Sequence, residues 1–479
     1  MLNGLHCINQ RNILSNEHQK MSESEAKSVN PIAFILQTIG PTIVIIVVDI
    51  LLYPFTRYVV NRFNRRINLH LFTIFGTFLI IFMFHAEAII PTVMGVIGYF
   101  LLELNPIIPI VYAFIFSSAI HIYCMLKVTK GWQWMVDGIT MIIFQKIMMT
   151  SLDLYHGRKL KQGLKVRPIH SRVALEKKMS LEEWISYIFT PYGSASGPVY
   201  CYKVHDYILT IGEKPKLSDE SISHKTAFKK FISLPFWILF SFFALKITPI
   251  SFYKKPFFVN SNVVVRLLLM LVCTFFHTVR YFTAWVSVEA GIYETGVAES
   301  GLCDFDDISN LTIFDVLMSK SVGVWLQKWN HSAHIFWKNY FLYPLLDSGV
   351  KYSIANPSVF VASALWHGFH PVYYMLLPEM LASTTADRII HSLFGDTDNF
   401  SLPMKVLNTF WVWLSMFDTT ASWWYRTYDS YFFVKKSNDY LGTILVFLVF
   451  IIFEVLSIFK KPLPKYTKKE ESKTKDKSE

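Results

Sequence analysis

The chain has 479 residues, of which 52% are hydrophobic and only 17% are charged, whereas a soluble globular domain carries about 25% charged residues. Its net charge of +11 lies in short segments between long apolar stretches, which is the positive-inside pattern of membrane proteins rather than the basic face of a nucleic-acid-binding protein. Composition therefore argues against a soluble fold and against nucleic acid as a partner.

Apolar residues gather into stretches that begin just after the polar residues 1–30. Because those first residues are polar, the first span is expected to be a retained anchor rather than a cleaved signal peptide. A helix needs roughly 20 apolar residues to cross the hydrocarbon core of a bilayer. Spans are predicted near residues 32–54, 71–84, 88–103, 106–126, 132–152, 231–247, 263–285, 355–378, 402–418 and 440–459. The pattern predicts an all-α polytopic membrane protein with about nine to eleven transmembrane helices.

Two further stretches, 184–200 and 310–328, are too short or too polar to cross the bilayer simply. They are expected to be re-entrant or interfacial, since irregular backbone at membrane depth needs surrounding protein or a water-filled cavity. We see no internal repeat and no soluble domain of meaningful size. The sequence predicts a polar segment at 1–30, one membrane domain at 31–459 and a disordered basic tail at 460–479.

Basic residues between the spans predict the orientation of the chain. The segment 157–178 is rich in Lys and Arg and contains a single acid, Glu176, and the tail 460–479 is rich in lysine. A third basic segment follows the first span and carries Arg57, Arg62, Arg65 and Arg66 with no acid between them. The positive-inside rule predicts that all three segments face the cytosol and that the N-terminus is luminal. Lys475 and Lys477 resemble an endoplasmic-reticulum retrieval signal, and a merely solvated charged tail is the alternative.

Two polar side chains in apolar surroundings are the candidates for chemistry. His367 is predicted to lie midway along an uncharged span, where an ionisable group is expensive and marks a functional site by default. Imidazole titrates near neutral pH and suits proton transfer, although a histidine bonded to a neighbouring helix is the structural alternative. Asn330, in the polar stretch 327–332, is the second candidate. It also reads as a glycosylation sequon, as do Asn310 and Asn399, but this pattern is weak.

Other kinds of site find little support in the sequence. His367 and His370 are spaced like a pair of metal ligands, as are His331 and His334, but no carboxylate or cysteine joins either pair at ligand spacing. No metal site is therefore predicted. The five cysteines are widely spaced and form no zinc or disulfide pattern. A transporter would show paired broken helices in two repeats, and the sequence shows no such pairing.

Motifs surround both candidates. Asn330 and His367 each follow a tryptophan, Trp329 and Trp366. Further stretches read M-V-D-G-I-T-M-I-I-F-Q-K at 135–146, F-T-A-W-V-S-V-E-A-G at 282–291, I-S-N-L-T-I at 308–313 and L-W-H-G at 365–368. Together, over roughly residues 130–380, they resemble the membrane-bound O-acyltransferase family in its lysophospholipid acyltransferase branch.

This resemblance implies an enzyme that moves an acyl group from acyl-CoA, as co-substrate, to a lysophospholipid hydroxyl, with no cofactor. It implies His367 as the general base, and Asn330 either as a donor to the thioester oxygen or as a group that orients the acceptor. Re-entrant segments and helices would enclose the catalytic chamber in the endoplasmic-reticulum membrane. The predicted substrate-binding residues are Trp329, Trp366, Glu289 and Trp285.

Two alternatives stay open within this resemblance. The acceptor can instead be a protein Ser or Cys, a sterol or a diacylglycerol, although the stretches at 282–291 and 308–313 favour a lysophospholipid. The basic segment 157–178 can attract the phosphates of CoA, or it can simply reflect positive-inside topology.

Overall fold

The computed structural model describes residues 40–127, 136–194, 197–247, 250–304, 306–421 and 428–460. Within these ranges every regular element is a helix, and one isolated β-bridge pairs Leu311 with Trp329. The prediction of an all-α fold is confirmed. The polar segment 1–30, and the tail after Lys460 with its predicted retrieval signal, lie outside the described residues.

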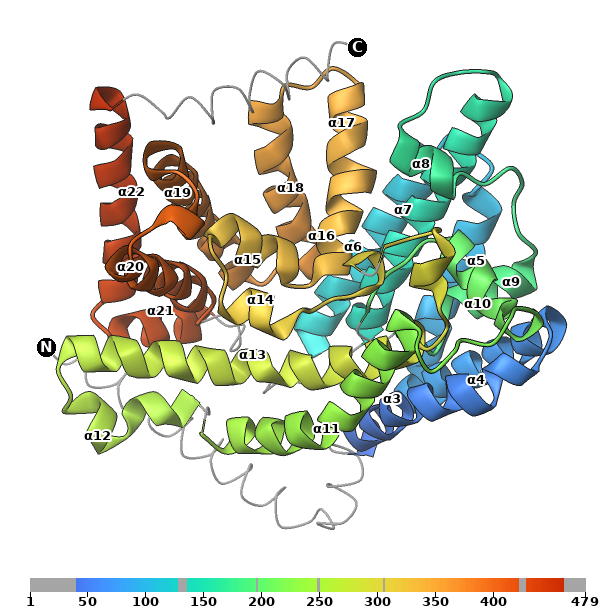
Figure 1. The fold of residues 1–479 in the computed structure, drawn as a ribbon, viewed down its shortest axis with the longest axis horizontal. Helices are drawn as coiled ribbons and strands as arrows, with labels where there is room; N and C mark the ends of the chain where they lie inside the picture. Colours follow the sequence, from blue (N-terminus) through green and yellow to red (C-terminus); the bar gives the residue numbers. More distant parts are fainter. Residues whose placement is uncertain are drawn as a thin grey trace, which may run out of the picture. The chain divides into compact units, whose positions relative to one another are not determined.

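Figure 1 shows the helices in chain order. They are α3 (Gly40–Tyr58), α4 (Arg65–Phe84), α5 (Ile89–Leu101), α6 (Ile107–Lys127), α7 (Val136–Lys161), α8 (Pro168–Val173), α9 (Leu181–Ile188), α10 (Tyr202–Leu209), α11 (Ile222–Ile247), α12 (Pro256–Val259), α13 (Val263–Tyr293), α14 (Ile313–Leu317), α15 (Val322–Lys328), α16 (His331–Phe336), α17 (Tyr343–Asp347), α18 (Tyr352–His367), α19 (Pro371–Phe394), α20 (Leu402–Trp413), α21 (Tyr428–Ser437) and α22 (Leu441–Phe459). The π-helical turns η7 (Trp337–Leu342) and η9 (Leu414–Asp418) continue α16 and α20. The chain divides into two compact units, Met1–Val48 and Asp49–Glu479, and the candidate site lies wholly in the second.

Among the described residues, four helical stretches are long and apolar enough to cross a membrane. They are Arg65–Leu101, Ile107–Lys127, Val263–Tyr293 and Leu441–Phe459. Each overlaps a stretch that the sequence predicts as a span. Large apolar side chains on these helices are exposed, such as Ile115 at 61% and Ile451 at 56%. Hydrocarbon would solvate such a surface, whereas water would not.

The prediction of one continuous span at 355–378 is wrong. Helix α18 ends at His367, and α19 begins at Pro371. Between them Gly368 adopts φ 106°, a conformation that glycine reaches without a Cβ clash. Proline at the first turn of α19 has no N–H to lose there. His367 is therefore the last residue of a helix rather than the middle of a span, because a glycine and a proline interrupt an otherwise uniform apolar run.

The stretches expected to be re-entrant or interfacial are indeed short or irregular. In 184–200, α9 ends at Ile188, and the described residues that follow, 189–194 and 197–200, are buried and non-helical, including Tyr192 at 0% exposure. In 310–328 the chain forms only the short helices α14 and α15. The buried Lys146 on α7 donates from Nζ to the Tyr187 carbonyl at 2.7 Å. Protein thus surrounds the irregular backbone, as membrane depth requires.

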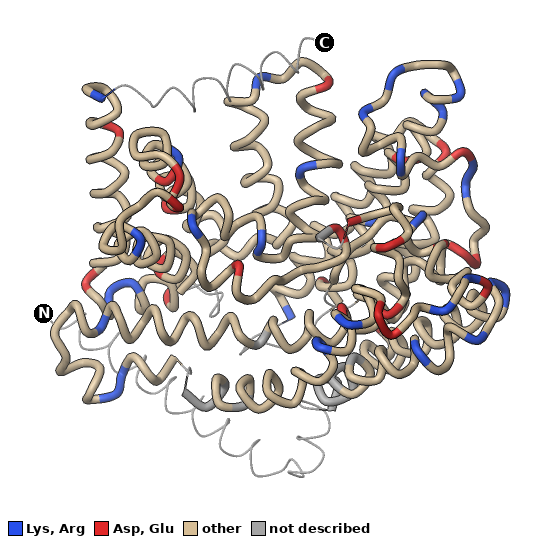
Figure 2. The backbone as a smooth tube through the Cα atoms, viewed as in Figure 1, with Lys and Arg blue, Asp and Glu red and all other residues tan. Residues whose placement is uncertain are grey.

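The segment 157–178 and the described end of α22, after which the predicted cytosolic tail begins, lie at one edge of the second unit. Arg167, beside α8, forms a bidentate contact with Asp347 at the end of α17. Figure 1 shows α8, the turn between α17 and α18, and the end of α22 along its upper edge. Figure 2 shows basic residues at all three places. The topology prediction requires this shared edge, and the assignment of the edge to the cytosol stays a prediction.

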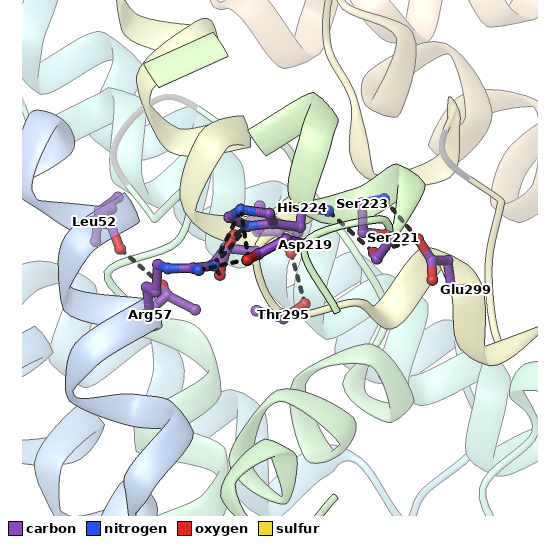
Figure 3. A network of polar contacts seen from close by, with 11 residues as sticks. Leu52, Arg57, Asp219, Ser221, Ser223, His224, Thr295 and Glu299 are labelled. Atoms are coloured by element: carbon purple, nitrogen blue, oxygen red, sulfur yellow. Dashed lines mark hydrogen bonds and ion pairs between the residues drawn. The ribbon is translucent and has the colours of Figure 1, made fainter. Parts of the chain in front are cut away.

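A buried ion network joins α3, α11 and α13 (Figure 3). Glu294, 1% exposed, accepts from Arg57 Nη1 at 2.9 Å and contacts His224 Nδ1 at 2.8 Å. Asp219 Oδ1 accepts a hydrogen bond from Arg57 Nη2 at 3.0 Å. Each buried charge is thus paired, which is the condition for burying it.

Candidate active site

A helical hairpin has the two candidate residues at the same end of its two arms. One arm runs through α16, η7 and α17, which hold 6, 6 and 5 residues, and the other is α18 with 16 residues. Asn330 immediately precedes the first arm, and His367 ends the second. Because the arms have nearly equal length and run in opposite directions, Asn330 and His367 lie at the end opposite the turn. Figure 1 shows α16 and α17 beside α18.

Aromatic side chains hold the arms together near that end. Trp337 on η7 meets Trp366 on α18 edge to face, with ring centroids 6.0 Å apart. Trp337 lies two turns along from Asn330, about 10 Å of helix, and Trp366 directly precedes His367. This packing holds together the arm that follows Asn330 and the arm that ends at His367, a relation that the separation of the two residues in sequence does not reveal.

His367 is half-buried and lies between two aromatic rings. Its centroid is 4.6 Å from that of Trp366 and 5.5 Å from that of Tyr373 on α19. The Tyr374 hydroxyl donates to the Gly368 carbonyl at 3.0 Å, which fixes the backbone immediately after the histidine. Contacts on both sides of the helix break therefore restrict where the imidazole can lie.

Trp366 anchors the end of α18 to two other helices. Its indole Nε1 donates to the Met141 carbonyl on α7 at 3.1 Å. Its own carbonyl contacts His121 Nε2 on α6 at 3.0 Å. The indole is buried at 7% exposure. The structure thus gives Trp366 a supporting place beside His367, and its predicted contact with substrate stays a prediction.

Asn330 has a left-handed backbone, with φ 48° and ψ 52°, a region in which asparagine is enriched among residues other than glycine. It is the N-cap residue of α16, and its carbonyl accepts from the His334 N–H at 3.1 Å. Its side chain makes no capping hydrogen bond. Within the described structure, the cap therefore does not consume the amide group that the proposed chemistry needs.

Trp329 belongs to an aromatic cluster beside Asn330. Its ring stacks on Trp325 at 5.3 Å and meets Trp285 at 5.0 Å. Trp285 is buried at 3% exposure, whereas Trp329 is half-buried. The structure brings these two predicted residues together next to Asn330.

Glu289 lies at the C-terminal part of α13 and is 0% exposed. Lys230 of α11 donates to its carboxylate at 2.6 Å. Its other oxygen accepts from the Asn310 and Leu311 backbone N–H groups at 2.5 and 3.2 Å. The carboxylate is thus engaged by protein groups, and its predicted contact with substrate stays a prediction.

The three sequons differ in accessibility. Asn310 is 0% exposed, so an oligosaccharide cannot be accommodated there in the folded protein. Asn330 is half-buried, and Asn399 is exposed. Burial thus argues against glycosylation at Asn310, which the sequon pattern alone could not indicate.

Sequence reasoning did not find a small pocket of about 50 Å³ on the flank of the hairpin. Its lining combines polar and apolar side chains from α7, α8, the 302–308 loop and the first arm, among them His170, Arg172, Ser332, Asn339 and Tyr340. Burial lowers the pKa of His170 to about 4, so its imidazole is neutral at pH 7. The basic segment 157–178 contains α8 and thus two residues of the pocket lining, His170 and Arg172, so it was the feature of the sequence that could have indicated this pocket.

The chemistry available here is that of an imidazole, a primary amide and aromatic walls. An imidazole can accept a proton, and an amide NH₂ can donate to developing negative charge. Among the described residues, no three or more His, Cys, Asp or Glu side chains gather as metal ligands would.

Comparison with known proteins adds an independent finding. The model of the membrane-bound O-acyltransferase family matches residues 96–393, a range that includes both Asn330 and His367. The chain is 25% identical over 370 residues to a membrane-bound glycerophospholipid O-acyltransferase 2 from Gallus gallus, covering 71% of this chain and 67% of that protein. It is 26% identical over 284 residues to lysophospholipid acyltransferase 6 from Drosophila melanogaster, covering 54% of this chain and 38% of the other.

A similar relative is the human membrane-bound glycerophospholipid O-acyltransferase 1, at 25% identity over 278 residues, covering 53% of this chain and 54% of that one. The chain thus spans about half the length of several curated relatives that it matches.

Proposed function

This chain belongs to the membrane-bound O-acyltransferase family, and we propose that it transfers a fatty acyl group from acyl-CoA to the free hydroxyl of a lysophospholipid, with the sn-2 position as the acceptor. The relatives named as glycerophospholipid and lysophospholipid acyltransferases support this acceptor class. The observation that supports the proposal is the hairpin, in which Asn330 directly precedes one arm and His367 ends the other.

His367 acts as the general base in this proposal. Its neutral imidazole takes the proton from the acceptor hydroxyl while the hydroxyl oxygen attacks the thioester carbonyl. The tetrahedral intermediate then expels the CoA thiolate, which receives a proton from the imidazolium. General-base assistance of this kind typically contributes about 10²–10⁴-fold to the rate.

Asn330 has two roles open to it. Its amide can donate to the oxygen that becomes negative in the tetrahedral intermediate, or it can orient the acceptor hydroxyl towards His367. Direct attack by the hydroxyl needs no covalent acyl-enzyme, so no activated Ser or Cys is required. Trp329 and Trp285 offer apolar surface beside the amide for the acyl chain or the lipid.

The membrane setting suits both substrates. A lysophospholipid can reach the site from the bilayer, and the CoA head stays in water on the cytosolic side, where the basic segment 157–178 attracts its phosphates. We place the enzyme in the endoplasmic-reticulum membrane, the location implied by its resemblance to the lysophospholipid acyltransferase branch.

A microsomal assay tests the proposal. Membranes containing the chain are given a panel of lysophospholipids and acyl-CoAs, with membranes containing the His367→Ala variant as the control. We expect diacyl phospholipid to form from at least one lysophospholipid in the wild-type membranes only. If sterol, diacylglycerol or peptide is acylated and no lysophospholipid is, the proposed acceptor class is wrong.

A further inference from the structure

A buried segment lies against both neighbours of Asn330. We call residues 308–311 the strap, and its four residues are between 0% and 4% exposed. Leu311 pairs with Trp329 in an antiparallel bridge. The Asn310 carbonyl accepts from the His331 N–H at 3.1 Å. The residues before and after Asn330 are thus both attached to the strap.

A side-chain contact reinforces this attachment. The Ser332 hydroxyl donates to Asn310 Oδ1 at 2.5 Å and accepts from the Val199 N–H at 3.0 Å. A left-handed conformation is less favourable than a right-handed one for a residue with a Cβ. The backbone of Asn330 keeps this conformation because the strap holds the chain on either side of it.

Glu289 in turn holds the strap. One carboxylate oxygen accepts from two successive strap N–H groups, those of Asn310 and Leu311, at 2.5 and 3.2 Å. The other accepts from Lys230 Nζ at 2.6 Å. Hydrogen bonds to an ionised acceptor are roughly twice as strong as neutral ones. A rigid connection therefore runs from α11 and α13 through the strap to Asn330.

We propose that Glu289 is a positioning residue for the reaction, which sets the backbone of Asn330 through the strap and so aims the Asn330 amide. The proposal rests on the proposed function, because Asn330 acts only if acyl transfer occurs here. In this proposal Glu289 acts on Asn330 rather than contacting the substrate. The hydrogen bond between Glu289 and the Asn310 backbone then explains why both residues belong to the motifs.

The chain supplies a matched control for Glu289→Gln. Glu294 is the C-cap residue of the same helix, is 1% exposed, and contacts α11 through His224 at 2.8 Å. Its hydrogen bonds go to Arg57 and His224 rather than to the strap. Both variants neutralise a buried carboxylate that contacts α11, whereas loosening of the strap is specific to Glu289→Gln.

The experiment measures kcat and KM for the best lysophospholipid with Glu289→Gln, Glu294→Gln and Asn330→Ala, and with Glu289→Gln combined with Asn330→Ala. A misplacement of about 1 Å costs around 10²-fold in rate. We expect Glu289→Gln to lower kcat by about that factor with KM little changed, and Glu294→Gln to keep the wild-type kcat. In the Asn330→Ala background, Glu289→Gln should add little, because the group that it positions is gone.

Three outcomes would overturn the inference. Equal losses in Glu289→Gln and Glu294→Gln point to a general structural role. Multiplied losses in the double variant show that Glu289 acts independently of Asn330. A raised KM with unchanged kcat assigns Glu289 to substrate binding.

If Glu289→Gln does not accumulate, Ser332→Ala removes the contact with Asn310 without disturbing a charge, and unchanged kcat in that variant counts against the strap. An inactive wild-type enzyme would instead refute the proposed function.

Discussion

Replacing His367 with alanine should separate catalysis from folding. Loss of a general base typically lowers the rate by about 10²–10⁴-fold, which corresponds to about 3–5 kcal/mol of activation free energy. The structure indicates that the fold does not depend on this side chain, because Trp366 anchors the end of α18 to α6 and α7. Hydrogen bonds within membranes contribute only about 0.6 kcal/mol on average, so the free energy of unfolding should change little.

The assay compares kcat and melting temperature of the purified wild-type and His367→Ala proteins in detergent. We expect kcat to fall by at least about 10²-fold while the melting temperature and the elution volume in size-exclusion chromatography stay near those of the wild type. His370→Ala is the control. His370 follows the helix break at Gly368 and is the N-cap residue of α19, so it lies beyond the helix that carries His367, and its loss should reduce kcat far less.

Near-normal kcat in purified His367→Ala protein would refute the assignment of the general base. Failure of that variant to accumulate, with His370→Ala unaffected, would instead show that the imidazole supports the structure. Equal losses in both variants would indicate disruption of the α18–α19 junction rather than removal of a base.

Three further predictions follow from the topology and the site. In sealed microsomes, added protease should cleave the segment 157–178 and the C-terminal tail, and protection of either would contradict their cytosolic assignment. Asn330→Ala should lower kcat more than it lowers expression, and mass spectrometry should find Asn330 without a glycan. Gly368→Ala should lower both kcat and melting temperature, because φ 106° is strained for alanine and its Cβ would lie 2.9 Å from His121 Nδ1. Strain of this kind costs about 1–3 kcal/mol, and an unchanged Gly368→Ala enzyme would show that the helix break is not essential.

The sequence alone established the class of protein and its main helices. Apolar runs such as 106–126 and 440–459 reappear as α6 and α22 nearly residue for residue. This success has a local cause, since a segment surrounded by hydrocarbon must satisfy its backbone hydrogen bonds internally, and a helix does so with its own residues. The motifs around Asn330 and His367 also pointed to the family that the comparison shows.

Hydropathy could not locate the end of α18. The stretch 355–378 is uniformly apolar in the sequence, yet the chain breaks after His367, where Gly368 and Pro371 allow α19 to begin as a separate helix. Apolar composition reports the solvent around a segment and not its backbone angles, so it cannot distinguish one long span from two helices.

Only the tertiary structure decided which residues work together. Asn330 and His367 lie at the same end of the hairpin, because Asn330 precedes one arm and His367 ends the other. Glu289 bonds to the strap through the Asn310 and Leu311 backbone N–H groups. Such contacts join residues far apart in sequence and depend on the packing of entire helices, whose geometry no local pattern encodes. In the sequence Glu289 is one charged residue of a motif, whereas in the fold it bonds to the strap that contacts both neighbours of Asn330.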